Sequence, residues 1–144
     1  MEIDGILPMM LSDARDVLVE FGPGRVPLVD LIDDWAGRVL KLFYDSRETD
    51  RDVFHEWGAD DLVGALYLRD AVDRGLATLR ARHLSGDIAA VRAIDELFRS
   101  MTIEDDRGLT VVEPDAPLSP WWWKRVPSRG PVVVEIEEIH RRLS

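Results

Sequence analysis

The chain has 144 residues, 46% apolar and 32% charged, as in ordinary globular proteins, and no apolar run approaches the ~20 residues of a membrane span. It contains no cysteine, which excludes disulfides, a thiolate nucleophile and a zinc site built on sulfur. The formal charge of −10 repels phosphate backbones and anionic lipids, so we expect no nucleic acid and no membrane among its partners.

The first 22 residues predict a cytoplasmic protein and one short helix. Residues 1–11 carry two acids and no Lys or Arg, the wrong charge for a secretory signal or transit peptide, so we expect a cytoplasmic protein. Ser12 is a good N-cap, and Ala14, Val17, Leu18 and Phe21 recur at helical spacing, which predicts a helix over 12–22. Residues 22–27, Gly-Pro-Gly-Arg-Val-Pro, follow as a turn and lack the Gly-Lys-Ser/Thr ending of a phosphate loop.

Three long amphipathic segments predict the central helices. Apolar stripes at 3.6-residue spacing cover 28–44, 61–84 and 87–101, and the intervening residues 45–52 are polar. Residues 53–57 predict one further helical turn. In the second long helix, Gly64, Leu68, Ala71 and Gly75 form a ridge of small and apolar residues that favours close approach of another helix. Charged residues four apart are interpreted as solvent-exposed ion pairs; the pairs are Asp34–Arg38, Arg69–Asp73, Asp70–Arg74, Arg92–Glu96, Asp95–Arg99, Glu137–Arg141 and Glu138–Arg142.

The character of the sequence changes after residue 101. Leu109 to Val112 is a β-type run, and five of the eight prolines fall between Pro114 and Pro131, which predicts an extended path. Residues 132–143 then have apolar positions at helical spacing, with a strand over 132–136 as the alternative. We therefore expect one mainly α-helical domain over 1–144, an irregular bundle of about five helices. It comprises a helical core (12–101), an extended or β-type Pro/Trp-rich segment packed across it (102–131) and a C-terminal helix (132–143).

Three consecutive tryptophans, residues 121–123, stand within the proline-rich segment. In an extended chain successive side chains alternate, so Trp121 and Trp123 are expected to close the core while Trp122 faces outward. Lys124, Arg125 and Arg129 form a basic cluster beside them. Because Trp and Arg are enriched at the energetic centres of interfaces, we predict a partner surface at Trp122, Lys124, Arg125 and Arg129.

No catalytic motif is found in the sequence. Glu137-x-x-His140 resembles one half of the paired motif of four-helix di-iron proteins, which use it twice. Asp30-x-x-Asp33 and Asp70-x-x-Asp73 resemble, with shorter side chains, the paired acids that hold magnesium in the all-α nucleotide pyrophosphohydrolases. These four aspartates define the alternative metal site, and with it the alternative function of a small divalent-metal-dependent hydrolase or ligand-binding protein.

The preferred function is that of an acidic, non-enzymatic interaction protein without a cofactor. Its charge attracts basic proteins, so we expect an inhibitor or immunity-type protein that covers a basic surface of a toxin or nuclease. A homodimer closed through the Gly64/Ala71/Gly75 ridge or the tryptophan patch is compatible with either function.

Overall fold

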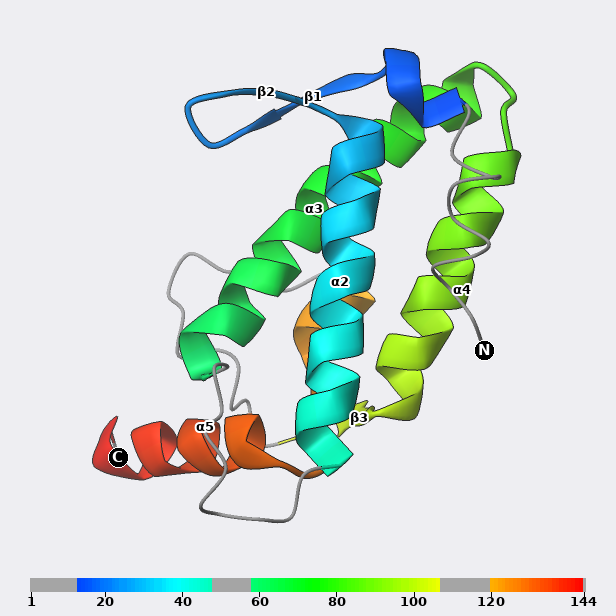
Figure 1. Cartoon of the computed structure of the whole chain (residues 1–144). Coiled ribbons are helices and arrows are strands. Elements are labelled where there is room, and N and C mark those ends of the chain that lie inside the picture. The colour runs from blue at the N-terminus through cyan, green and yellow to red at the C-terminus, as the bar shows by residue number, and fades with distance from the viewer. Residues whose placement is uncertain (1–12, 48–57, 107–119, 144) are drawn as a thin grey trace. The chain divides into compact units, whose positions relative to one another are not determined.

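A computed structural model describes residues 13–47, 58–106 and 120–143 (Figure 1). The described residues are 73% helical, in four α-helices with two small antiparallel strand pairs, so the mainly helical class is confirmed. The expected count of about five helices is matched only roughly. Predictions for 53–57, 109–112 and the prolines 114 and 117 lie outside the described residues.

Three α-helices correspond to the long amphipathic segments. They are α2 (Leu28–Arg47), α3 (Ala59–Ala81) and α4 (Gly86–Ser100). Helix α3 ends three residues before the predicted boundary because His83 adopts a left-handed conformation with φ of 58°. The amide of Leu84 then donates to the carbonyl of Leu79, and the amide of His83 to that of Arg80, which together form a Schellman motif.

The chain groups into two compact units, residues 1–39 with 68–97 and residues 40–67 with 98–144. We call these the first and the second unit. Helices α2, α3 and α4 each contribute residues to both units, and each unit is described separately below.

The first unit opens with a β-hairpin where a helix over 12–22 was expected, so that prediction is wrong. A 3-10 turn, η1 (Asp13–Asp16), leads into β1 (Leu18–Phe21), which pairs with β2 (Gly24–Pro27). The turn residues are Gly22, at φ of 64°, and Pro23, whose φ is fixed near about −65°, a combination that fits a type II′ turn. Val17 and Val19 are buried while Leu18 between them is 59% exposed, so the local period is two and not 3.6.

Apolar residues from the hairpin and the three helices form the core of the first unit. Gly75 of α3 makes this packing close, since a Cβ placed there would lie 2.5 Å from Leu28 Cδ1 and 2.9 Å from Val19 Cγ2. The ridge residues Ala71 and Gly75 are therefore covered by the chain itself. The buried apolar residues of this unit include Ala14, Val17, Val19, Leu28, Leu31, Ile32, Trp35, Val72, Leu76, Leu79, Val91 and Ile94.

The second unit contains the other strand pair and the C-terminal helix. Strand β3 (Thr102–Glu104) pairs antiparallel with β4 (Arg125–Pro127), which directly follows the 3-10 helix η3 (Trp121–Lys124). Helix α5 (Pro131–Leu143) confirms the C-terminal helix and not the alternative strand. Its core includes Leu42, Leu62, Ala65, Leu66, Phe98, Met101, Trp122, Trp123, Val126, Val132 and Ile136. Among the described helices, none is both long enough and apolar enough to cross a membrane.

Candidate interaction surface

The three tryptophans form a single turn of 3-10 helix and not an extended strand. The amide of Trp123 donates to the carbonyl of Pro120 over 3.2 Å. With about three residues per turn, the three side chains leave the axis about 120° apart, so the alternation expected for an extended chain does not apply. Trp122 and Trp123 are buried, at 4% and 2% exposure, and Trp121 is half-buried.

Aromatic contacts explain why Trp122 and Trp123 are buried while Trp121 is only half-buried. Trp123 packs edge to face against Tyr67 of α3, with ring centroids 4.9 Å apart. Trp122 meets Trp121 edge-on at 5.6 Å, and Trp121 also contacts Phe98 of α4 at 6.1 Å. The expectation that Trp122 faces outward is therefore wrong, and Trp121 is the member of the run that reaches the surface.

The guanidinium of Arg99, near the C-terminal end of α4, lies over the Trp121 ring, 3.8 Å from its centroid. A cation this close to an indole face is attracted by the negative electrostatic potential of the ring, an interaction worth about 0.5–1 kcal/mol at exposed sites. The stack restricts the orientation of both side chains.

Trp121 and Arg99 border a hollow of about 360 Å³, which we call the Trp121 hollow. Its described lining residues all belong to the second unit and come from α4, β3, the turn that follows β3, η3 and β4. They are Arg99, Glu104, Asp105, Asp106, Trp121, Lys124 and Arg125.

Arg125 links the elements that line this hollow through its hydrogen bonds. Its Nε donates to Thr102 Oγ1 over 2.8 Å, and its Nη2 donates to the carbonyl oxygens of Thr102 at 2.6 Å and Arg99 at 3.3 Å. Thr102 Oγ1 in turn donates to the carbonyl of Phe98 over 2.9 Å. The guanidinium therefore joins the end of α4 to both strands, and much of its donor capacity is used inside the protein.

Two acidic residues of the hollow, unlike Arg125, are directed to solvent and not to internal hydrogen bonds. Glu104 and Asp106 are exposed, and neither carboxylate forms an ion pair or hydrogen bond with another residue of the described ranges. The backbone between them is anchored, because the amide of Asp105 donates to the carbonyl of Lys124 over 2.9 Å. The hollow thus offers an aromatic ring, a stacked guanidinium and two accessible carboxylates on a fixed frame.

The four residues predicted as a partner surface do not stay together. Lys124 and Arg125 line the Trp121 hollow, Trp122 belongs to the core, and Arg129 lines a separate hollow of the same unit. The sequence did not indicate Arg99, which precedes the tryptophan run by more than twenty residues.

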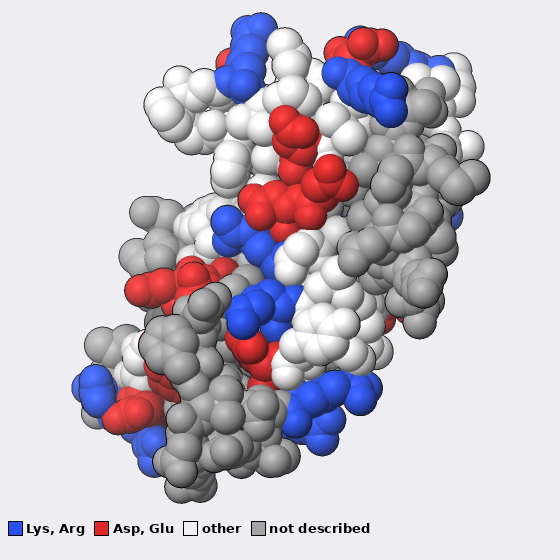
Figure 2. Space-filling model, in the orientation of Figure 1, with Lys and Arg blue, Asp and Glu red and all other residues white. Residues whose placement is uncertain are grey.

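The acids of the alternative metal site lie in the first unit, Asp30 and Asp33 on α2 and Asp70 and Asp73 on α3. Within the described ranges, no three His, Asp or Glu side chains are grouped so that they could hold a metal ion. Asp73 instead lies 3.8 Å from Arg69 Nη1. Figure 2 shows acidic side chains gathered over the upper part of α2. The exposed acids of α2 include Asp30, Asp33 and Asp34.

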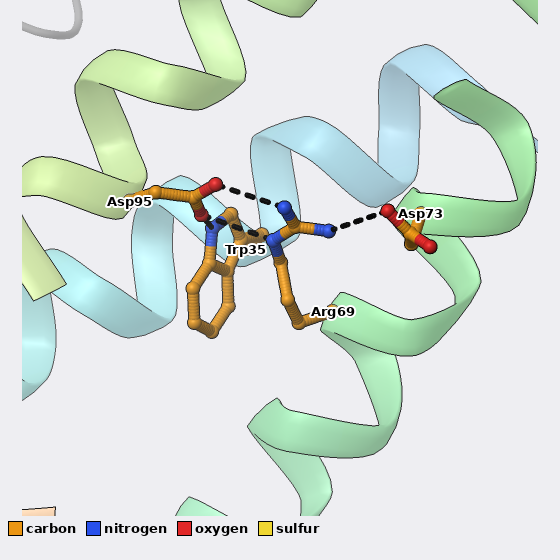
Figure 3. Close-up of polar contacts among 4 residues, drawn as sticks. All are labelled: Trp35, Arg69, Asp73 and Asp95. Carbon is orange, nitrogen blue, oxygen red and sulfur yellow. Dashed lines mark hydrogen bonds and ion pairs between the residues drawn. The ribbon is translucent and has the colours of Figure 1, made fainter. Parts of the chain in front are cut away.

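A buried polar cluster joins the three helices of the first unit (Figure 3). Arg69 of α3, at 4% exposure, donates from Nε and Nη2 to the two carboxylate oxygens of Asp95 in α4, over 3.0 and 2.8 Å. Trp35 Nε1 of α2 donates to Asp95 Oδ1 over 3.1 Å. The predicted pair of Arg69 with Asp73 is present, but the prediction that Arg69 and Asp95 lie at the surface is wrong. Both side chains are buried, and Asp95 pairs with Arg69 of another helix and not with the residue four positions away.

Comparison with known proteins finds no match for this chain. The chain matches no family model, no curated protein and no solved structure.

Proposed function

We propose that the protein is a non-enzymatic interaction module, of inhibitor or immunity type, which binds a basic protein partner at the Trp121 hollow. The observation that carries the proposal is the half-buried Trp121 with Arg99 stacked on its ring, beside two exposed carboxylates.

The aromatic part of the hollow supplies an anchor for a partner. Trp and Arg dominate the energetic centres of protein interfaces because they bring a large contact area that can be fully desolvated. Trp121 contacts the rings of Phe98 and Trp122 and the guanidinium of Arg99. Little side-chain freedom is then lost on binding, which leaves more of the contact energy as affinity.

The charges favour a basic partner. Arg125 makes its hydrogen bonds inward, whereas Glu104 and Asp106 have no partner among the described residues and can accept donors from outside. Exposed Lys124 lines the same hollow, so the hollow itself carries both signs and the general preference for a basic partner comes from the net charge. The net charge of −10 acts over a longer range and raises the rate of encounter with a cationic protein. We expect an Arg or Lys side chain of the partner to enter the hollow.

The test is affinity capture from a native lysate at low salt, with the immobilised chain and two sets of variants. The wild type is expected to retain a protein of basic isoelectric point. Trp121→Ala should weaken retention of that protein by about tenfold or more, as expected for loss of an anchor worth about 2 kcal/mol. Tyr44→Ala is the matched control, because Tyr44 is an exposed aromatic residue outside the hollow, at 67% exposure.

A second comparison separates the local site from the general charge. Glu104→Gln with Asp106→Asn removes two negative charges at the hollow, and Asp30→Asn with Asp34→Asn removes two from the exposed face of α2. The Glu104/Asp106 double variant should bind the partner much more weakly than the wild type, and the Asp30/Asp34 double variant only slightly more weakly. Failure to retain any protein at low salt, or equal loss in both pairs, contradicts the proposal.

A further inference from the structure

A second hollow of the second unit has a different chemical character. It measures about 460 Å³ and lies between the end of α2, the end of α4 and the loop that precedes α5. We call it the Arg47 hollow. Its lining within the described ranges contains no acidic residue and consists of Phe43, Ser46, Arg47, Ser100, Met101, Ser128 and Arg129.

The two arginines of this hollow have their charges available. Both are exposed, and neither makes an ion pair or hydrogen bond with any other residue of the described ranges. The chain as a whole has 28 acidic residues and a net charge of −10. Some arginines on the helices are paired, as in Arg38 with Asp34 and Arg142 with Glu138, whereas Arg80 and Arg92 have no side-chain partner within the described ranges.

The position of each guanidinium is restricted by its surroundings. Arg47 lies over the ring of Phe43, 4.1 Å from the centroid, which holds the side chain against the wall of the hollow. On the other side, the amide and the hydroxyl of Ser128 both donate to the carbonyl of Met101, over 3.0 and 3.1 Å. These bonds fix the backbone immediately before Arg129.

The loop and the end of α2 also meet through their backbones. A Cβ on Gly130, whose φ is 101°, would lie 2.8 Å from Ser46 Cα, so only glycine permits this approach. Ser46 precedes Arg47 and Gly130 follows Arg129. The contact therefore keeps the two arginines on the same hollow.

We propose that the Arg47 hollow binds the phosphate group of a small organic phosphate. Two guanidinium forks match the oxygens of a phosphate and give charge-assisted hydrogen bonds, while Phe43 and Met101 provide an apolar wall for the organic part. The acidic field of the whole chain disfavours a polyanion or a membrane, so a compact ligand with one phosphate group fits best. This site is separate from the Trp121 hollow, with which it shares no lining residue.

The experiment is an NMR titration of the ¹⁵N-labelled chain with inorganic phosphate and with phenyl phosphate, at constant ionic strength. We expect saturable shifts of the Ser46, Ser100 and Ser128 amides, and tighter binding of phenyl phosphate than of inorganic phosphate. Because each guanidinium contributes charge-assisted hydrogen bonds, Arg47→Gln and Arg129→Gln should each weaken binding by about tenfold or more.

The control variant is Arg92→Gln, which removes an exposed arginine of α4 that belongs to the first unit and should leave the affinity unchanged. Arg129→Lys keeps the charge but loses the planar fork, and we expect it to bind phenyl phosphate more weakly than the wild type. Absence of saturable shifts, equal weakening by Arg92→Gln, or no preference for phenyl phosphate overturns the proposal. None of these outcomes depends on whether a protein partner is captured at the Trp121 hollow.

Discussion

Gly75 shows how closely the hairpin, α2 and α3 pack in the first unit. Its missing side chain leaves room for Leu28 and Val19, whose methyl groups would lie within 3 Å of an added Cβ. We expect Gly75→Ala to lower the free energy of unfolding. Overpacking costs about 1–3 kcal/mol, whereas the gain in helix propensity is at most about 1 kcal/mol. Urea denaturation followed by circular dichroism measures the difference.

Gly37 provides the matched control for that substitution. It also lies inside an α-helix, but it is exposed and an added Cβ would meet no atom within 4 Å. Gly37→Ala should therefore raise the free energy of unfolding, by about 0.5–1 kcal/mol. A loss of stability in both variants would show that helix packing at Gly75 is not the cause.

Arg69 and Asp95 are expected to be strongly coupled. Each side chain is buried, and removing either one leaves the other as an uncompensated charge, at a cost of about 3–5 kcal/mol. The double variant Arg69→Met with Asp95→Leu removes both charges, although Trp35 Nε1 then loses its acceptor. We expect the double variant to lose much less stability than the two single variants together.

The measurement is a double-mutant cycle built from urea unfolding of the four proteins. A coupling energy of more than about 1 kcal/mol supports the buried pair. Additive losses would contradict it. Sequence spacing could not reveal this pair, because Arg69 and Asp95 lie on different helices, 26 residues apart, and each has an oppositely charged neighbour four residues away.

At the scale of elements, the sequence predicted the helices well and the hairpin not at all. The stripes over 28–44, 61–84 and 87–101 each continue for several turns, and a strand cannot bury residues at that spacing. The segment before residue 22 is shorter, and its apolar residues fit both the 3.6-residue period of a helix and the two-residue period of a strand. In this segment tertiary packing selects the strand, since Val17 and Val19 are the residues that become buried.

The candidate site was predicted only in part, for a similar reason. The tryptophan run and its basic neighbours are visible in the sequence, but which ring reaches the surface depends on the backbone conformation. Prolines favoured an extended path, whereas the chain turns as 3-10 helix at 121–124. Arg99 reaches the site through the packing of α4, which no local pattern contains.

The 3-10 turn makes a direct prediction for fluorescence quenching. Trp121 is half-buried, while Trp122 and Trp123 are at most 4% exposed. We expect iodide to quench a component of the emission that Trp121→Phe removes. Trp122→Phe, the matched control, should leave the iodide-accessible fraction unchanged. Loss of that fraction in the Trp122 variant instead would mean that Trp122 faces solvent.

At the scale of the whole molecule, charge is arranged unevenly around the two hollows. The chain is strongly acidic, yet among the described residues the Arg47 hollow is lined by two guanidiniums without an ion-pair partner and by no acid, and the Trp121 hollow mixes both signs. A uniform acidic surface would serve solubility alone. Both proposals start from these local departures, and both hollows belong to the second unit.

The last prediction concerns cooperativity between the two units. Helices α2, α3 and α4 each run through both, so we expect the units to unfold together, as a single domain over 1–144 requires. Indole NMR signals provide one probe in each unit, Trp35 in the first and Trp123 in the second. Both should disappear at the same urea concentration, and Gly75→Ala, although it lies in the first unit, should lower both midpoints equally. A shift confined to Trp35 would show instead that the units unfold independently, because a destabilising change is transmitted only within one cooperative structure.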